Sequence, residues 1–146
     1  MDINEALNEV FVKVFKNITA IEERVIHTEE YQKATTNEMH VIEAIGTGKP
    51  KNMTSVAKAL SVTTGTLTIA VNSLVKKGFV ERVRSEEDRR VVLISLTEKG
   101  KKVYMRHKAF HKELVESIVN QLDDQEKILL QKVLSNLNQY FKEMQQ

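Results

Sequence analysis

The histidines of this chain are its side chains best suited to proton transfer or metal binding at neutral pH. His107 and His111 lie four residues apart, a spacing that places both imidazoles on one face of a helix. Together with His40 and Glu22 they form a set of residue types that can bind zinc. They can equally be half-buried histidines bonded to neighbours, because His107 falls in a row of apolar residues. We expect no resident cofactor, with zinc as the alternative.

The remaining chemistry-bearing residues argue against catalysis. The chain has no cysteine, so it has neither a thiolate nucleophile nor a thiolate metal ligand. It has no glycine-rich phosphate loop and no Ser-His-Asp order at a recognisable spacing. We therefore expect a protein that is not an enzyme.

A second pattern with a possible binding function is the stretch SEEDRRVVLISLTEKG at residues 85–100. An arginine at a hairpin tip can enter the minor groove of DNA, where a neighbouring carboxylate can hold the guanidinium in one rotamer. Here Asp88 would orient the cation, and Arg89 or Arg90 would insert. The alternative is an ordinary charged hairpin with a weak surface ion pair.

A third pattern is the threonine-rich stretch TTGTLTIAVN at residues 63–72. Thr63 is a good N-cap, and a helix that follows it would present one small, polar face suited to a major groove. The residues expected on that face are Thr64, Gly65, Thr66, Thr68, Ile69 and Asn72, and Thr63 is also expected to contact DNA. Such side chains offer methyl and hydroxyl contacts, which favour an A·T-rich site, although a solvated helix face is also possible. We expect Lys76, Lys77 and Arg84 to contact phosphates.

Charge is segregated along the chain, although the formal net charge is only +2. The net charge is −5 over residues 1–48, +3 over 49–75, +7 over 76–112 and −3 over 113–146. The basic middle contains both the threonine-rich stretch and the arginine stretch. A basic block in a nearly neutral chain indicates a surface that binds a polyanion such as DNA.

The elements that must position these residues can be read from hydrophobic periodicity. Apolar residues spaced 4-3-4-3-4 predict a long helix over residues 3–28, with the stripe Leu7, Phe11, Val14, Ile18, Ile21 and Val25. Caps and breakers predict further helices from Thr35 to about Gly46, over 53–60, from Thr63 to 77, from Thr97 to about 122, and from Asp123 onward. Residues 79–84 and 91–96 are predicted strands of a hairpin.

This order predicts a mainly α fold with a small β wing, a winged helix-turn-helix with flanking dimerisation helices. We expect residues 1–146 to form a single domain, with the winged helix-turn-helix over 36–97 and dimerisation helices over 1–30 and 98–146. The apolar stripes of the flanking helices exceed what the winged lobe can cover. A homodimer is therefore expected.

Residues 54–100 resemble the winged helix-turn-helix of the MarR family of bacterial transcription regulators. The resemblance is carried by the threonine-capped helix, the segment KKGFVER, the Asp88-Arg89-Arg90 triplet and the segment LTEKG. In that family an Asp-x-Arg pattern lies in the wing, which maps onto Asp88 and Arg90. The segments NEMHVIEAIG, VTTGTLT and HKAFHKELVE further resemble the fatty-acid-synthesis repressors of Gram-positive bacteria within the family.

The resemblance implies a dimeric DNA-binding repressor with an A·T-rich pseudo-palindromic operator and a long-chain acyl carrier protein as co-repressor. Lys108 and Lys112 would meet the acidic carrier. The implied acyl pocket comprises Val14, Ile18, Met39, Ile42, Val103, His107, Phe110, His111 and Leu114, all of which can instead be core residues. Some zinc-responsive MarR-like repressors resemble the histidine arrangement, which keeps the zinc alternative open.

The expected location is the cytoplasm, without contact with a membrane. Absence of cysteine fits a reducing compartment, the N-terminus does not resemble a signal peptide, and no apolar stretch reaches the length of a membrane helix. A competing interpretation is a winged-helix protein-interaction module that has lost DNA binding. That class would carry acidic or bulky apolar residues on the recognition face, unlike residues 63–72.

Overall fold

The computed structural model describes residues 1–26 and 34–146, without the side chains of residues 19, 25 and 26. Its elements run along the chain as α1 (Ile3–Glu9), η1 (Val10–Val14), α2 (Phe15–Ile26), α3 (Thr36–Ile45), β1 (Lys51–Asn52), α4 (Met53–Ala59), α5 (Thr64–Lys76), β2 (Val80–Arg84), β3 (Val92–Leu96), α6 (Glu98–Val119) and α7 (Asp124–Met144). The protein is thus mainly helical, with a small antiparallel sheet of order β1-β3-β2. The predicted fold class is confirmed.

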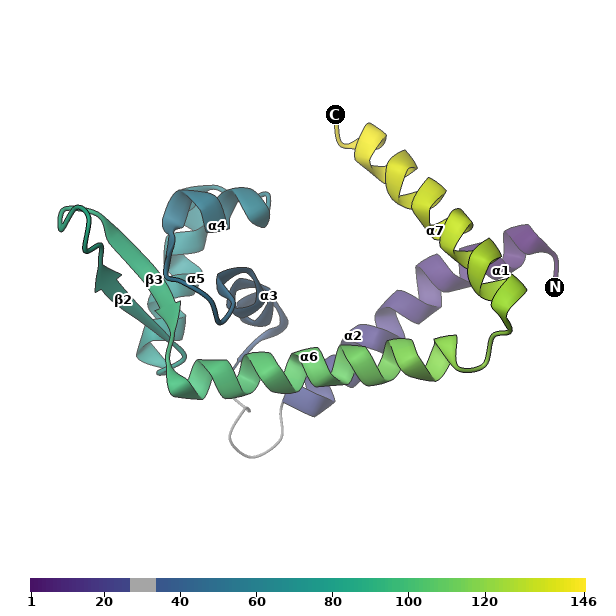
Figure 1. Cartoon of the computed structure of the whole chain (residues 1–146), viewed down its shortest axis with the longest axis horizontal. Coiled ribbons are helices and arrows are strands. Elements are labelled where there is room, and N and C mark those ends of the chain that lie inside the picture. The colour runs from purple at the N-terminus through teal and green to yellow at the C-terminus, as the bar shows by residue number, and fades with distance from the viewer. Residues whose placement is uncertain (27–33) are drawn as a thin grey trace. The chain divides into compact units, whose positions relative to one another are not determined.

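The contacts divide the described chain into two compact units, residues Met1–Lys108 and Ala109–Gln146. The first contains the complete winged helix-turn-helix, in which the β2–β3 hairpin extends from the end of α5 (Figure 1). The second contains the C-terminal part of α6 and all of α7. None of the helices in the described ranges has both the length and the apolar character needed to cross a bilayer.

The first unit folds around one apolar core to which α3, α4, α5, the sheet and the start of α6 contribute. Its buried apolar residues are Ala34, Met39, Val41, Ile42, Ile45, Val56, Ala57, Leu67, Val71, Leu74, Phe79, Val80, Ile94, Leu96 and Val103. The predicted inward residues of α5, Leu67, Val71 and Leu74, are among them. The hydrophobic effect therefore fixes which face of α5 is left for solvent.

Local signals set the helix starts. Thr35, Asn52, Thr63 and Asp123 each accept a hydrogen bond from the backbone N–H three residues ahead. The predicted capping box at Thr35 is only half formed, because the Glu38 carboxylate pairs with Lys77 Nζ at 2.6 Å instead. A partner distant in sequence thus takes the side chain that the local motif would have used.

The N-terminal helix differs from the prediction. A π-helical turn, η1, separates α1 from α2, so the helix is not regular through Val10–Val14. A π turn holds an extra residue, which rotates the apolar stripe between its two sides. The side chains of Leu7, Phe11, Val14 and Ile21 are 45%, 37%, 38% and 40% exposed in the single chain. The predicted end of this helix, at 27–28, lies outside the described residues.

The strand β1 was not predicted. Lys51 and Asn52 pair with Ile94 and Leu93 of β3. Two residues are too few to show the alternation that marks a strand in a sequence, so the sequence does not predict it. The strand forms because the edge of β3 supplies its hydrogen-bond partners.

Candidate DNA-binding surface and histidine cluster

Helix α5 carries the face that the sequence assigned to DNA. Thr63 caps the helix by accepting from Thr66 N at 3.1 Å, and its hydroxyl donates to Thr66 Oγ1 at 2.9 Å. The exposed residues of α5 include the predicted set Thr64, Gly65, Thr66, Thr68, Ile69 and Asn72. A helix with one buried and one small, exposed face is the element that enters a major groove in helix-turn-helix proteins.

The hydroxyls on this face are partly committed to the helix itself. Thr68 Oγ1 donates to the carbonyl oxygen of Thr64 at 2.8 Å. Thr68 can therefore offer DNA its methyl group and an acceptor lone pair more readily than a proton. Ile69 is 75% exposed, which is unusual for isoleucine and suits apolar contact with a thymine methyl group.

At the tip of the hairpin, Asp88 holds Arg90. Arg90 Nε and Nη2 donate to the two carboxylate oxygens at 3.1 and 3.2 Å, and its backbone N–H donates to Oδ1 at 3.0 Å. The side-chain bond, then the backbone bond, hold the pKa of Asp88 below its ordinary value of 3.8. The Arg90 side chain is 92% exposed. Of the two candidate arginines, Arg90 is the one that this carboxylate orients.

The rest of the wing is built from backbone acceptors. Arg84 Nη1 donates to the carbonyl oxygen of Arg89 at 2.9 Å, which ties strand β2 to the tip. Val91 N–H donates to the Asp88 carbonyl at 2.9 Å, and this bond closes the turn without a glycine. Arg89 itself is exposed.

The predicted phosphate-binding residues fall into two groups. Lys76 and Arg84 are exposed, near the exit of α5 and on the wing. Lys77 is half-buried and forms its ion pair with Glu38 of α3, so its charge is largely balanced within the protein. Lys77 therefore joins the end of α5 to α3 through an ion pair.

Sequence reasoning missed Arg82. This exposed residue of β2 donates from Nη2 to Asn72 Oδ1 of α5, a bond that joins the wing to α5. The signal available in the sequence was its place two residues before Arg84 in the basic block. That placement alone does not reveal a partner ten residues away.

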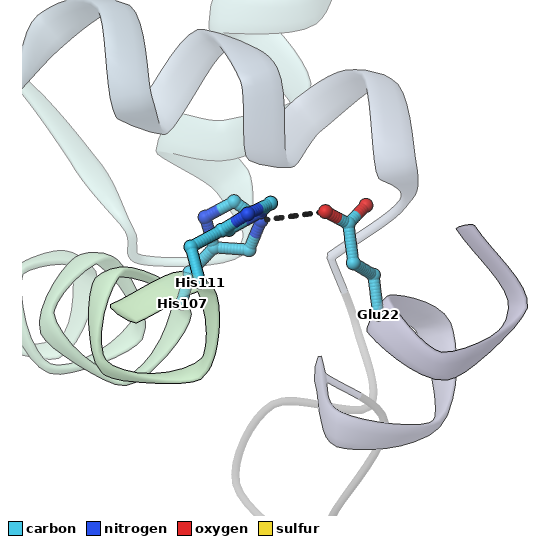
Figure 2. Close-up of side chains that lie close together, drawn as sticks. All are labelled: Glu22, His107 and His111. Atoms are coloured by element: carbon cyan, nitrogen blue, oxygen red, sulfur yellow. Dashed lines mark ion pairs between the residues drawn. The ribbon is translucent and has the colours of Figure 1, made fainter. Parts of the chain in front are cut away.

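A second group of residues surrounds His107, which is only 3% exposed. Its Nε2 lies 3.5 Å from Glu22 Oε1 of α2, and its Nδ1 lies 2.8 Å from Glu43 Oε1 of α3. In Figure 2 the rings of His107 and His111 lie next to each other on one face of α6, with a dashed line joining His107 to Glu22. We call Glu22, His107 and His111 the histidine cluster; each offers one possible ligand atom, all within 4.8 Å of one another.

The predicted zinc set is only partly assembled. His40 does not join the histidine cluster but lies exposed on α3, where it lines a groove together with α5 residues such as Thr66 and Ile69. Glu43, three residues further along α3, is the acidic neighbour that sequence reasoning missed. His40 lies on the part of α3 that faces the α5 groove, whereas Glu43 lies on the part that reaches His107.

The residues of the implied acyl pocket have different environments. Met39, Ile42 and Val103 belong to the core of the first unit and are at most 2% exposed. Ile18, Phe110, His111 and Leu114 are half-buried, and Val14 is 38% exposed. The acyl pocket stays a prediction, and the core residues among this set have an ordinary packing role.

The chain is similar to known transcriptional regulators. A family model described as transcriptional regulator SarA/Rot matches residues 25–106. The regulator SarZ of Staphylococcus haemolyticus is 34% identical over 98 residues, which cover 66% of this chain and 67% of SarZ. The match with the regulator YhjH of Bacillus subtilis is 29% identical over 89 residues and spans about half of YhjH, 51%.

Among solved structures, FabT of Streptococcus pneumoniae in complex with DNA superposes with a TM-score of 0.88 at 38% identity, covering 97% of this chain and 99% of FabT. Solved MarR-family regulators below 25% identity share the fold. The matched region includes the α5 face and the Asp88–Arg90 wing. The chain therefore belongs to the SarA/Rot family of MarR-like winged-helix proteins, and it is a DNA-binding transcriptional regulator, not an enzyme.

Proposed function

We propose that this regulator is a homodimeric repressor of fatty-acid-synthesis genes, and that acyl carrier protein with a long acyl chain raises its DNA affinity. The observation that carries the proposal is the likeness to FabT over nearly the full length of both chains. The sequence segments that resemble fatty-acid-synthesis repressors lie on both sides of the DNA-binding region as well as within it. The resemblance is therefore not limited to the helix-turn-helix and wing.

The geometry of the winged lobe supports the following docking mode on DNA. Helix α5 enters a major groove, and the Arg90 guanidinium, held by Asp88, enters the adjacent minor groove. A narrow A·T-rich minor groove has the more negative potential and favours that arginine. In a two-fold dimer the second copy reads a half-site about 34 Å away, which implies a pseudo-palindromic operator.

The dimer is supported by apolar side chains that the single chain leaves exposed on its N- and C-terminal helices. On the N-terminal helix they include Ile3, Leu7, Val10, Phe11, Val12, Val14, Phe15 and Ile21. On α6 and α7 they include Val115, Ile118, Val119, Ile128, Leu129, Val133, Leu134, Tyr140, Phe141 and Met144. Patches of this kind in a soluble protein mark interfaces.

A surface suited to the acidic carrier protein lies on α6. Lys101, Lys108 and Lys112 follow one another at helical spacing, with Met105, 54% exposed, between the first two. Cations around an exposed apolar residue favour an acidic partner that also offers apolar contact. Lys112 also lies 3.8 Å from Glu116, too far for a strong competing pair.

The acyl chain needs a covered apolar site. Met39, Ile42 and Val103 are close-packed, so a chain inserted among them must separate core residues. Phe110 and Leu114 of α6 are half-buried and could be covered by a ligand without emptying the core. We expect the acyl chain to contact these two.

A second candidate function is zinc-dependent regulation through the histidine cluster. Two imidazoles and a carboxylate are ligands that zinc prefers. A spread of 4.8 Å between ligand atoms requires only a modest closing movement to reach the metal. Such a site would link α2 to α6, so that metal binding changes how tightly these helices are held.

One experiment separates the two candidates. The full chain is titrated onto a labelled A·T-rich pseudo-palindromic duplex by fluorescence anisotropy, with long-chain acyl carrier protein, zinc or a chelator added in turn. Tighter binding with the acylated carrier, and not with the unacylated carrier, supports the proposed repressor. A response to zinc alone contradicts the carrier assignment and supports the second candidate.

Variants with matched controls test which residues are responsible for the response to the carrier and to zinc. Charge reversal at Lys108 and Lys112 should abolish the response to the carrier, while Lys132→Glu on α7 should preserve it. His111→Ala should abolish a zinc response, while His40→Ala, outside the histidine cluster, should preserve it. Equal loss in a variant and its control would contradict the site concerned.

A further inference from the structure

The bond between Arg82 and Asn72 joins two elements that the proposed docking places in different grooves. Asn72 lies in the third turn of α5, and Arg82 lies in the middle of β2, paired with Ile94 of β3. Residues 80, 82 and 84 share one face of the strand because side chains alternate. Val80 on that face is buried at 2% exposure, so the face turns toward the helical core. Arg82 thus bridges from the wing to the recognition helix.

When a recognition helix occupies a major groove and its wing occupies the next minor groove, one sugar-phosphate strand separates the two grooves. That strand must pass between the helix and the wing. The guanidinium of Arg82 lies between the same two elements and is tied to one of them. It has five N–H donors, and one is given to Asn72, so the others remain suitable for phosphate oxygens.

The same bond changes the role expected of Asn72. An asparagine reads adenine by accepting from N6 with Oδ1 while donating to N7. Here Oδ1 already accepts from a cation, whose donors would compete with the adenine amino group. Because arginine only donates, the acceptor in this bond must be the asparagine oxygen.

We propose that Arg82 clamps the phosphate strand between the two grooves, and that Asn72 positions its guanidinium instead of reading a base. This assignment rests on the docking geometry proposed above. It predicts that both residues contribute affinity that is independent of sequence. It also couples the wing to α5, because Arg82 contacts the phosphate strand only when both elements occupy their grooves.

The test measures affinity as a function of salt for the full chain on a fixed A·T-rich duplex, after confirming that the wild type binds it. Affinity falls as salt rises, and each lost phosphate contact makes the slope of log affinity against log salt less steep by about 0.9. Arg82→Gln should reduce the magnitude of the slope by that amount, which makes the loss of affinity between 50 and 200 mM salt about 3.5-fold smaller. Arg82→Lys keeps the positive charge and should retain most of the wild-type slope. Lys132→Gln, the control, removes a positive charge from α7 and should leave the slope unchanged.

Asn72→Ala is the decisive variant. If Asn72 positions Arg82, this variant lowers the slope, leaves the preference at every base pair of the half-site intact, and adds little to Arg82→Gln in the double variant. If it instead relaxes preference at one base pair and keeps the slope, Asn72 reads a base and the proposal is wrong. A wild-type slope in Arg82→Gln, or loss of a single G·C preference there, also overturns it. Failure of the wild type to bind would contradict the docking geometry itself.

Discussion

At the residue scale, the pair formed by Asp88 and Arg90 determines how the wing presents its cation. A bidentate pair with an added backbone bond restricts the guanidinium to one orientation although its side chain is almost fully exposed. An isolated surface pair adds little to stability. Its value here is orientation, which lowers the conformational entropy that binding must remove.

The pKa of Asp88 reports on this pair. Because Arg90 lowers that pKa below 3.8, the pair is fully formed above 3.8 and is lost only as the pH falls through the lower folded value. The wing should therefore keep its geometry throughout the physiological pH range. Arg90→Ala should return the pKa of Asp88 toward 3.8, as measured by NMR titration of its carboxyl carbon, whereas Arg89→Ala should leave it low. An unchanged pKa in Arg90→Ala would contradict the assigned pairing.

Arg90→Ala should also weaken DNA binding, most strongly at sites with A·T-rich flanks, because the narrow minor groove there has the strongest negative potential. Anisotropy titrations on duplexes that differ only in their flanks measure this. The affinity difference between A·T-rich and G·C-rich flanks should shrink in the variant. Equal flank discrimination in variant and wild type would show that Arg90 does not enter the minor groove.

At the element scale, the start of α6 is fixed by contacts with Gly78 and Phe79, in the connection between α5 and β2. Thr97 caps α6 by accepting from Gly100 N at 3.1 Å, and it donates to the Gly78 carbonyl at 2.6 Å. Lys99 Nζ lies 4.7 Å from the centre of the Phe79 ring. The glycine in the LTEKG segment has a packing reason, since a Cβ at Gly100 would lie 2.0 Å from the Phe79 carbonyl oxygen.

Gly100→Ala should therefore destabilise the protein by about 1–3 kcal/mol or more, through a steric clash with backbone that cannot move cheaply. On helix propensity alone the same change would stabilise by up to about 1 kcal/mol, so the sign is diagnostic. Urea denaturation followed by circular dichroism measures the change. Gly48→Ala is the matched control, because no atom lies within 4 Å of its added Cβ, and it should stay within about 0.5 kcal/mol of wild type. A stable Gly100→Ala would contradict the close approach of α6 to Phe79.

At the scale of the whole molecule, the exposed apolar residues at both ends of the chain favour a homodimer in which a second protomer buries them. Leu129 and Val133 of α7 are 63% and 49% exposed and follow one another at helical spacing. Burying such side chains contributes about 1.5–3 kcal/mol each, and two-fold symmetry doubles the number buried. In the proposed homodimer, burial of these side chains would therefore add stability that the single chain lacks.

Leu129→Glu should raise the dimer dissociation constant at least about tenfold, because each copy would bury a charge at the interface. Sedimentation equilibrium measures this, and circular dichroism checks that the helices remain. Lys132→Glu on the same helix should leave the dimer intact. An unaffected dimer in Leu129→Glu would place the interface on another of the exposed apolar faces.

The sequence alone determined most of the elements and which face of α5 is exposed. Helix caps, the apolar spacing of Leu67, Val71 and Leu74, and the change of period at residue 79 are local signals, and the structure follows them. The segregation of charge identified the basic block without any knowledge of folding. These features can be read locally because they depend on neighbours within a few residues.

The tertiary structure decided which distant side chains meet. Glu38 binds Lys77 instead of completing its capping box, Glu43 replaces His40 beside His107, and Arg82 reaches Asn72. It also decided the π-helical turn and strand β1. Each depends on how separate elements pack, and one sequence carries no periodic or local signal for the side chain that a neighbouring element will supply.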